Sequence, residues 1–363
     1  MLKKILCVIL ALSMVFVFIG CSAQEEAPKQ TQAPAANAEK APAAEAPAAE
    51  APKFEKQTIT FNFDQAETSI MGQGVAKFKE LVEAKTDGQV TVEVYYNGTL
   101  FNQGQQFEAT IKGSCDLILN AISNAASYVP DLQVAFAPYL WADFDHWNNF
   151  WTSADGQALL DQVANEVGVR YLAWFSNGQR DVELNIDKKL TSREDMSRLK
   201  LRAVPEASYQ FLVESLGASP VPIALADAYL ALETGVVDGL EIPVSDLFGQ
   251  GLQDVVKSVT RTGHMMQTIG FIVSEKQWQS WSPELQQVVM EAAQEAAAFT
   301  TELGTAAQAE SIEKLEAAGV VVYTLSAEEA AALRQEVIDW AMTTENAESW
   351  NMELYQKILD AAK

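Results

Sequence analysis

The fold is decided by residues 198–243, which read RLKLRAVPEASYQFLVESLGASPVPIALADAYLALETGVVDGLEIP. Apolar residues alternate with cations in LKLRAV, as on a strand with one buried face, and Pro205 ends that strand. Apolar residues at helical spacing follow, from Tyr209 to Leu216, and Gly217 caps that helix. A strand, a short helix and a further strand complete the stretch. Repeated units of this kind predict a parallel sheet.

Arg202 is the residue of this stretch that indicates a function. It lies at the carboxyl end of the first strand, and ligands of parallel sheets bind outside those ends. A guanidinium presents a fork of donors and a permanent charge, so it is suited to bind a carboxylate through two hydrogen bonds. From the pattern alone, the alternative is a solvated arginine at a strand end.

Three motifs within this stretch resemble those of a known family. In order they are LKLRAVP, LGASPVPI, and LETGVVDG followed by EIP. They resemble the signature of the TRAP-transporter solute-binding proteins of the DctP type, and milder similarity extends from residue 57 onward. The resemblance implies that Arg202 forms a salt bridge with the carboxylate of a bound solute. It also implies that Arg180, in the segment SNGQR, supplies a second arginine.

The same resemblance implies an α/β, periplasmic-binding-protein-like fold with two lobes, mixed but mainly parallel sheets and a long interdomain helix. We expect lobe I to hold residues 57–177 and 266–300, and lobe II to hold residues 178–265 and 301–363. The chain would cross between the lobes at residues 176–180. Ser282, Pro283 and Gly319 mark a helix over residues 283–318. At 1.5 Å per residue that helix would span roughly 50 Å and reach both lobes.

The first twenty residues have the features of an export signal. Lys3 and Lys4 precede an apolar run, residues 5–18, that is too short for a comfortable membrane span. Phe18-Ile19-Gly20-Cys21 resembles the lipobox of bacterial lipoproteins, so Cys21 is predicted to carry a lipid anchor such as palmitate. The alternatives are an ordinary signal peptide with an accidental cysteine, or an uncleaved anchor.

Residues 21–56 are predicted to be a disordered tether. The stretch is dominated by Ala, Pro and Glu, as in APAAEAPAAEAP, and has little to bury. Cys7 lies in the signal and Cys21 would be lipidated, which leaves Cys115 as a core residue with no disulfide partner. We therefore expect a body held away from a membrane, with no thiolate metal site and no cofactor.

The net charge of -24 and a pI near 4.4 argue against nucleic acid and anionic lipid surfaces as partners. The same charge does not exclude an anionic ligand. Charges beyond a screening length of ~8–10 Å fade, whereas an arginine within hydrogen-bond reach of a dehydrated carboxylate does not. Local geometry therefore outweighs the overall charge.

Other candidate site residues come from segments that the resemblance places near the solute. Loops after the first strands contribute the 64–67 segment, Asn102 and Asn120. The loop before an aromatic-rich helix contributes Tyr139 and Trp141. One of Trp174 and Phe175 should alternate toward the cleft at the crossing. The residues predicted to contact the solute are Gln65, Asn120, Tyr139, Trp141 and Trp174. Capping or turn roles are the alternative for the polar ones, and core packing is the alternative for the aromatic ones.

One departure from the family pattern bears on the solute. Ile242 stands where the family often has a solute-binding asparagine, and Leu225 stands where many relatives have an aromatic ring. Glu241, beside Ile242, is counted with the site. Aliphatic residues against a ligand would leave sugar hydroxyls unpaired, at roughly 1–3 kcal/mol each. We therefore predict an organic acid with an apolar or aromatic body.

Enzymatic function finds little support in the sequence. It has no G-x-S-x-G elbow, no G-x-x-x-x-G-K-[ST] loop and no H-E-x-x-H motif, and its two histidines are too few for a histidine metal site. The leading interpretation is a tethered solute-binding protein that passes a small organic acid to TRAP membrane permease subunits. A lipid-anchored surface hydrolase and a structural or adhesive lipoprotein remain alternatives.

Overall fold

The computed structural model describes residues 54–343, 345–348 and 350–362. The predicted signal, the predicted lipidation site Cys21 and the tether up to residue 53 lie outside the described residues. Within the described ranges, no helix is both long enough and apolar enough to cross a membrane.

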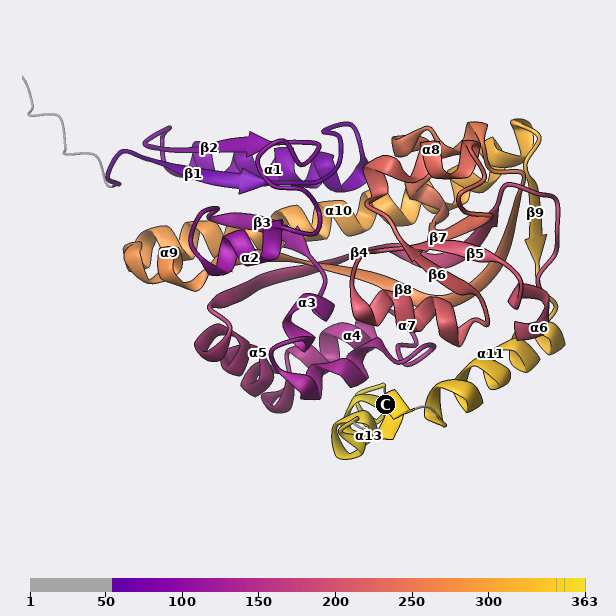
Figure 1. Cartoon of the computed structure of the whole chain (residues 1–363). Coiled ribbons are helices and arrows are strands. Elements are labelled where there is room, and N and C mark those ends of the chain that lie inside the picture. The colour runs from indigo at the N-terminus through magenta and orange to yellow at the C-terminus, as the bar shows by residue number, and fades with distance from the viewer. Residues whose placement is uncertain (1–53, 344, 349, 363) are drawn as a thin grey trace, which may run out of the picture. The chain divides into compact units, whose positions relative to one another are not determined.

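One sheet organises the described part of the chain (Figure 1). The strand order is β2-β1-β3-β8-β4-β7-β5-β6, with β9 paired to β8. Five of the eight pairings are parallel and three are antiparallel, as the prediction of a mixed, mainly parallel sheet requires. The strands are β1 Gln57–Asn62, β2 Val90–Tyr95, β3 Leu117–Asn120, β4 Val169–Leu184, β5 Lys200–Ala203, β6 Ser219–Pro222, β7 Gly239–Pro243, β8 Ser258–Ser274 and β9 Val321–Thr324.

Two long antiparallel strands, β4 and β8, join the halves of this sheet. At one end of the pair, β3 adds to β8 from Asn120 opposite Gly270, and β1 and β2 follow. At the other end, β7 adds to β4 from Pro243 opposite Arg180, and β5 and β6 follow. Between these regions the pairing of β4 with β8 shifts register at residues 176–178. The sequence predicted a strand ending at residue 175 and then a crossing, whereas β4 continues without interruption to Leu184.

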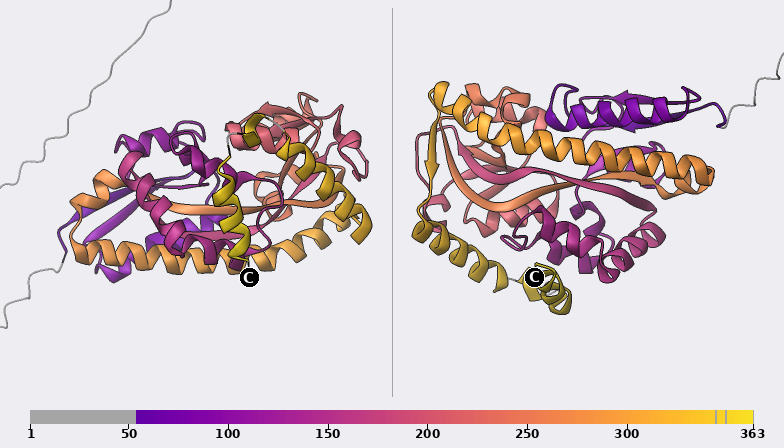
Figure 2. Two further views of the ribbon diagram at one scale, coloured as in Figure 1. Left: turned by 90° about the horizontal axis from the view of Figure 1, so that it is seen from below. Right: turned by 180° about the vertical axis from the view of Figure 1, so that it is seen from behind.

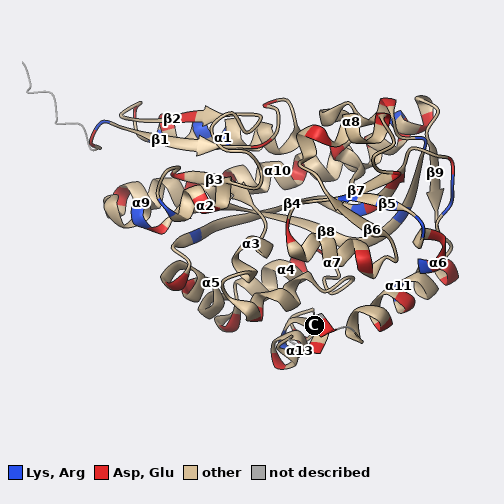
Figure 3. Cartoon of the chain, in the orientation of Figure 1, with Lys and Arg blue, Asp and Glu red and all other residues tan. Residues whose placement is uncertain are grey.

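Helices cover both faces of the sheet, and Figure 2 shows α10 running along its length. The α-helices are α1 Ile70–Lys85, α2 Gln106–Ile111, α3 Ser123–Ala126, α4 Phe144–Trp151, α5 Ala154–Glu166, α6 Arg193–Met196, α7 Ala207–Ser215, α8 Ala228–Glu233, α9 Glu275–Ser280, α10 Pro283–Ala317, α11 Ala327–Met342, α12 Glu345–Glu348 and α13 Met352–Asp360. Short 3-10 helices are η1 Pro130–Phe136, η2 Leu225–Asp227, η3 Val244–Asp246, η4 Phe248–Gln250 and η5 Leu252–Asp254. Acidic residues are spread over outer helices such as α5, α11 and α13 (Figure 3).

The predicted long helix is present as α10, which contains 35 residues. Its Ser282 cap accepts a hydrogen bond from the Leu285 N–H, Pro283 occupies the first turn, and Gly319 follows with φ of +86°. The buried side of α10 is rich in small residues, including Ala292, Ala296 and Gly304. Small side chains allow the helix to approach both α1 and β4 closely.

The buried apolar residues form three clusters. The largest surrounds β1, β3 and the β3-proximal part of β8, and includes Cys115, which is a buried free cysteine as predicted. The second contains Leu240 and Ile242 of β7. The third contains Val182 of β4 and Leu201 of β5. The two smaller clusters therefore belong to the part of the sheet around β5 and β7, whereas the largest belongs to the part around β1 and β3.

The C-terminal tail contacts both parts of the molecule. Leu333 and Val337 of α11 pack in the cluster with Val182 and Leu201. Beyond α11, the Ile358 carbonyl of α13 lies 2.6 Å from Nε2 of His146 in α4. The exact lobe boundaries given above stay a prediction, and α13 packs on elements from the range predicted for lobe I.

Candidate functional site

Arg202, at the end of β5, is a buried guanidinium without a carboxylate partner among the described residues. Its residue exposure is 1%. Its Nε donates to the Ile223 carbonyl at 2.6 Å, and Nη2 donates to Gln103 Oε1 at 3.1 Å. Desolvation lowers the pKa of Arg202 to about 10, although Glu241 and Asp64 partly offset that effect. The charge is therefore poorly compensated inside the protein.

Arg180, in β4, is buried beside Arg202 but is already paired. Its guanidinium makes two bonds to the Glu241 carboxylate, one of them from Nη2 to Oε1 at 2.7 Å. Nη1 donates to Gln267 Oε1 at 2.5 Å, and the guanidinium carbon lies 5.0 Å from the centre of the Tyr209 ring. Desolvation opposes ionisation, but the charge of Glu241 outweighs it and raises the pKa of Arg180. The predicted second arginine thus has its fork occupied by Glu241.

A cavity of about 60 Å³ is connected to these arginines through two of its lining residues. Gln103 accepts a hydrogen bond from Arg202 and Gln267 accepts one from Arg180, whereas neither arginine lines the cavity itself. Residues at the ends of β1, β3 and β5, in α7 and in the middle of β8 contribute to its lining. Two predicted site residues, Gln65 and Asn120, are among those that line it. The polar lining residues are Asp64, Gln65, Gln103, Gln106, Asn120, Glu206 and Gln267, and the apolar and aromatic ones are Phe63, Met71, Leu119, Ala121, Val204, Tyr209 and Ile269.

Two carboxylates of this lining, Asp64 and Glu206, have raised pKa values because burial disfavours their charged forms. The pKa of Asp64 rises to about 6, although a hydrogen bond from Gln103 and the charge of Arg202 oppose the shift. Oε2 of Glu206 accepts a hydrogen bond of 2.5 Å from Ser123 Oγ. Both acids contribute negative charge to the wall of the cavity.

The three predicted aromatic site residues do not line this cavity. Trp141 is buried, donates from Nε1 to the Ala135 carbonyl at 2.8 Å, and packs on Trp147. Tyr139 donates from its hydroxyl to the Thr262 carbonyl at 3.2 Å. The position of Trp141 therefore agrees better with core packing than with a place in the wall of a pocket. An indole nitrogen satisfied by a local carbonyl is enough to keep this ring in the core.

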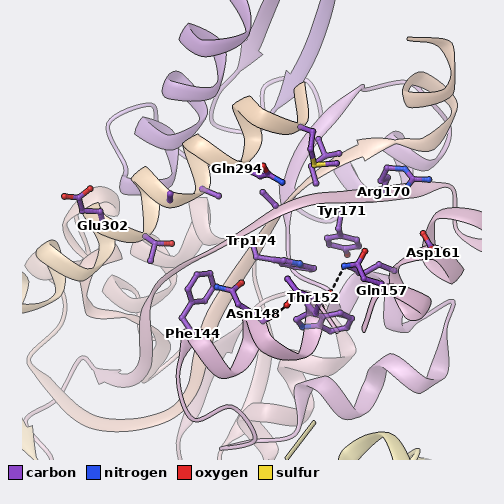
Figure 4. A pocket seen from close by; sticks show the side chains of 18 residues that line it. Phe144, Asn148, Thr152, Gln157, Asp161, Arg170, Tyr171, Trp174, Gln294 and Glu302 are labelled. Carbon is purple, nitrogen blue, oxygen red and sulfur yellow. Dashed lines mark hydrogen bonds between the residues drawn. The ribbon is translucent and has the colours of Figure 1, made fainter. Parts of the chain in front are cut away.

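Trp174 lies in a different hollow, a cleft of about 840 Å³ over β4 between α4, α5 and α10. Figure 4 shows Tyr171 and Trp174 in this cleft with Gln157, and the two rings stack at 4.6 Å. The cleft is larger than the cavity and shares no lining residue with it. Its arginine, Arg170, is held by two bonds of 2.8 Å to Glu275, so no unpaired cation is available there.

Leu225 and Ile242 were predicted to face the solute, and the structure places both in a buried apolar cluster instead. They pack with Leu240 and with residues of α8, and neither lines the cavity. Ile242 follows Glu241 on β7, so its side chain lies on the opposite strand face from the one that holds Arg180.

Sequence reasoning did not identify Gln103, Glu206 and Gln267 as site residues. Gln103 is the most connected of them, because its Oε1 accepts from both Arg202 and the Leu225 N–H. Glu206 carried a usable signal, since it follows the carboxyl end of β5 only four residues after Arg202. Gln267 lies within a long strand, and no local pattern distinguishes it from its neighbours.

The histidines have structural partners. Nδ1 of His264 lies 2.8 Å from Thr262 Oγ1, and Nε2 lies 3.4 Å from Glu241. In the described ranges no group of three or more His, Cys, Asp or Glu residues is arranged to hold a metal ion.

The fold and the site together define a two-lobed solute-binding protein. Two halves of a sheet are joined by a pair of long strands, and a buried cavity with an unpaired arginine lies beside the join. Binding sites between domains are the common arrangement for small ligands. Comparison with known proteins gives the family.

A family model described as bacterial extracellular solute-binding protein, family 7 (DctP), matches residues 61–344, and the chain belongs to that family. The C4-dicarboxylate-binding periplasmic protein DctP of Rhodobacter capsulatus is 29% identical over 280 residues, which cover 77% of this chain and 83% of the relative. The sialic acid-binding periplasmic protein SiaP of Vibrio cholerae is 26% identical over 266 residues, which cover 73% and 82%.

Solved structures of TRAP periplasmic solute-binding proteins share the fold. One from Roseobacter denitrificans with bound 3-deoxy-D-manno-oct-2-ulosonic acid has a TM-score of 0.79 and 27% identity, covering 85% of this chain and 100% of that one. One from Shewanella oneidensis with bound succinate has a TM-score of 0.78 and 25% identity, with the same coverage. The predicted family and two-lobed fold are thus confirmed, and the family is one of solute-binding proteins, not of enzymes.

Proposed function

We propose that this chain captures an organic acid in the cavity between its lobes, with Arg202 binding the carboxylate, and delivers it to TRAP membrane permease subunits. The observation that carries the proposal is the buried guanidinium of Arg202, which has no carboxylate partner among the described residues and donates to Gln103, a residue that lines the cavity. Buried charges in proteins are normally paired, because an isolated one is costly. A solute carboxylate would supply the missing partner through two charge-assisted bonds.

Arg180 has a supporting role in this proposal. Its bonds to Glu241 and Gln267 fix two side chains close to the cavity, and its charge adds to the positive potential there. Glu241 occupies the Nε and Nη2 edge of the Arg180 guanidinium, and Nη1 donates to Gln267. We therefore assign Arg180 and Glu241 as positioning residues of the site.

The cavity must enlarge to admit a solute. At about 60 Å³ it is much smaller than small-molecule pockets, which are typically about 300–1,000 Å³. Separation of the two halves of the sheet at the middle of β4 and β8 would open it. The lobes would then close on the bound acid, and release to the permease would require them to reopen.

The solute body was predicted to be apolar or aromatic, but the lining of the cavity supports a polar body. That prediction rested on Leu225 and Ile242, which pack in the apolar cluster around β7. Half of the cavity lining consists of carboxylate and amide side chains, and one of them, Gln65, has a buried Oε1 without a donor among the described residues, which a polar solute could pair. We propose a polar organic acid.

Calorimetric titration with a panel of organic acids tests the proposal. The protein should first be unfolded and refolded to remove any bound solute. We expect at least one acid to bind, and Arg202→Ala should weaken it by at least ~2 kcal/mol. Arg202→Lys should also bind poorly, because lysine keeps the charge but loses the planar fork.

Arg198→Ala is the matched control, because Arg198 is an exposed cation on the same segment. It should bind the acid as the unmodified protein does. Unchanged affinity in Arg202→Ala, with the fold intact by circular dichroism, would contradict the role assigned to Arg202.

We also propose that Cys21 anchors the protein to the outer side of a bacterial membrane. The support is the sequence alone: an export signal, a lipobox-like Phe18–Cys21 segment and an Ala/Pro/Glu tether. Cys21→Ser should abolish labelling of the protein by radioactive palmitate in cells. Labelling that persists in this variant would exclude Cys21 as the lipidation site.

A further inference from the structure

The cavity contains a buried hydrogen-bond acceptor without a donor from the described residues, beside two carboxylates. Gln65 is only 6% exposed, and its Oε1 atom has no hydrogen-bond donor within the described chain. The carboxylates of Asp64 and Glu206 line the same space. Buried acceptors without donors cost free energy, so a bound solute that stabilises this site must bring donors of its own.

The charges of the cavity lead to the same conclusion. No Lys, Arg or His in the described ranges forms an ion pair with Asp64 or Glu206. Arg180 is committed to Glu241, and Arg202 is the cation assigned to the solute carboxylate. Once Arg202 has been neutralised by the solute, two carboxylates remain beside it without a counter-charge.

We propose that the solute carries a protonated nitrogen as well as a carboxylate, and that Asp64, Glu206 and Gln65 Oε1 bind this nitrogen. The proposal rests on the proposed function, because Arg202 must hold the carboxylate end. An ammonium offers three N–H donors and one positive charge, which match three acceptors and an excess of negative charge. A hydroxyl offers a single donor and no charge, so it leaves the carboxylates uncompensated.

Proton release should accompany binding of such a solute. Burial raises the pKa of both carboxylates, that of Asp64 to about 6, and an adjacent cation favours their ionised forms. The other ionisable groups near them are Arg202, Arg180, Glu241, Tyr209 and Tyr171. The two arginines stay charged throughout the range in which Asp64 titrates.

Matched pairs of ligands test the proposal directly. The stripped protein should be titrated calorimetrically at pH 7.5 with each 2-amino acid and its 2-hydroxy twin, and with 4-aminobutyrate and 4-hydroxybutyrate. We expect at least one amino acid to bind at least ~30-fold more tightly than its hydroxy twin, because a close charge pair contributes that much binding free energy. Further titrations near pH 6, where Asp64 is about half protonated, should show release of protons when two buffers of different ionisation enthalpy are compared.

Two variants assign the nitrogen to the predicted acceptors. Glu206→Gln keeps an oxygen for the Ser123 hydroxyl, and Asp64→Asn keeps an oxygen for the Gln103 amide. Each should weaken the amino acid by about tenfold while changing the hydroxy acid by less than about threefold. Glu67→Gln is the control, because Glu67 is an exposed carboxylate on the same loop, and it should change neither affinity.

The outcomes separate this proposal from the proposed function. Hydroxy acids that bind through Arg202 as tightly as their amino twins would overturn the protonated nitrogen and leave carboxylate capture standing. Equal weakening of both twins by Glu206→Gln and Asp64→Asn would also overturn it. Failure of every acid of both sets to bind would overturn the carboxylate proposal itself.

Discussion

The buried guanidinium of Arg202 should destabilise the protein when no solute is bound. A pKa lowered from 12.5 to about 10 by desolvation corresponds to roughly 3 kcal/mol. Arg202→Met keeps the length of the side chain and removes the charge, but it also removes the bonds to Ile223 and Gln103, which are worth about 1 kcal/mol each. We expect the free energy of unfolding to rise by ~1–2 kcal/mol, measured by urea denaturation of solute-free protein.

The same variant, although more stable without solute, should lose solute binding. Arg202→Met should lose the rise in melting temperature that an organic acid causes, because the carboxylate has no partner. A binding site that costs stability is the expected trade-off between function and stability. If the variant proved less stable than the unmodified protein without solute, the view of Arg202 as an uncompensated charge would be wrong.

Asp246 is a second buried charge with a testable pH dependence. Desolvation raises its pKa from 3.8 to about 7, against two contacts of 2.9 Å with the Asn177 side-chain amide. The folded state therefore binds a proton more tightly than the unfolded state does, and this group reduces stability as pH rises from about 4 to about 7. The neighbouring Asn177 Oδ1 has no donor within the described residues.

Asp246→Asn should remove this pH dependence. An amide at position 246 cannot ionise, and its N–H groups can donate to Asn177 Oδ1. We expect the free energy of unfolding to rise by ~1–3 kcal/mol at pH 8 and to change little near pH 4, where Asp246 is protonated in the folded state and only partly ionised in the unfolded state. Asp254→Asn, an exposed carboxylate on η5, is the control and should change neither value. A loss of stability at pH 8 in Asp246→Asn would refute the argument.

At the scale of elements, the close packing of α10 against β4 requires a glycine at position 304. A Cβ at Gly304 would lie 2.6 Å from Cα of Asn177 in β4, which is closer than real contacts allow. Gly304→Ala gains about 1 kcal/mol in helix propensity, but overpacking against backbone typically costs about 1–3 kcal/mol. The clash should win, and thermal unfolding should show a net loss of stability.

Thr305→Ala is the matched control for this helix position. Thr305 is exposed, and its hydroxyl bonds only the Thr301 carbonyl one turn earlier. Alanine there should be neutral or slightly stabilising. A gain of stability in Gly304→Ala equal to that in Thr305→Ala would show that α10 does not pack against Asn177 as closely as described.

Elements with local signals were predictable from the sequence, whereas partners distant in the chain were not. Ser282, Pro283 and Gly319 determine the ends of α10 by themselves, so the helix was predicted within one residue of its observed end. The length of β4 was missed, because residues 176–180 look like a loop until β8 is paired beside them. Polar residues form a strand when a neighbouring strand satisfies their backbone groups.

Part of the candidate site was predictable from the sequence: Gln65 and Asn120 were candidates and line the cavity, whereas Gln103, Glu206 and Gln267 were missed. Arg202 could be found because a strand end and a family motif coincide there. The pairing of Arg180 with Glu241 joins residues 61 positions apart, and no spacing rule reports it. The orientation of Ile242 is set by the register of β7 against β4, which also is not a local property.

At the scale of the whole molecule, closure of the two lobes depends on a few polar bonds across the cavity. Gln103, from the loop before α2, connects with Arg202 and with the Leu225 N–H, at 3.1 and 3.3 Å. Ser123 of α3 connects with Glu206 at 2.5 Å. In the mechanism that we propose, these bonds belong to the closed form, and the solute stabilises that form.

Gln103→Ala should therefore weaken binding through closure. Without the amide the closed form loses bonds worth about 1–2 kcal/mol, and the apparent affinity falls by the same amount because the competent state is less populated. Small-angle scattering without solute should shift toward a larger radius of gyration, whereas saturating solute should restore the closed value. Gln105→Ala, two residues away and exposed, should change neither quantity. An affinity loss in Gln103→Ala with unchanged scattering at every solute concentration would assign Gln103 to the solute alone, and the two-state account of this site would fail.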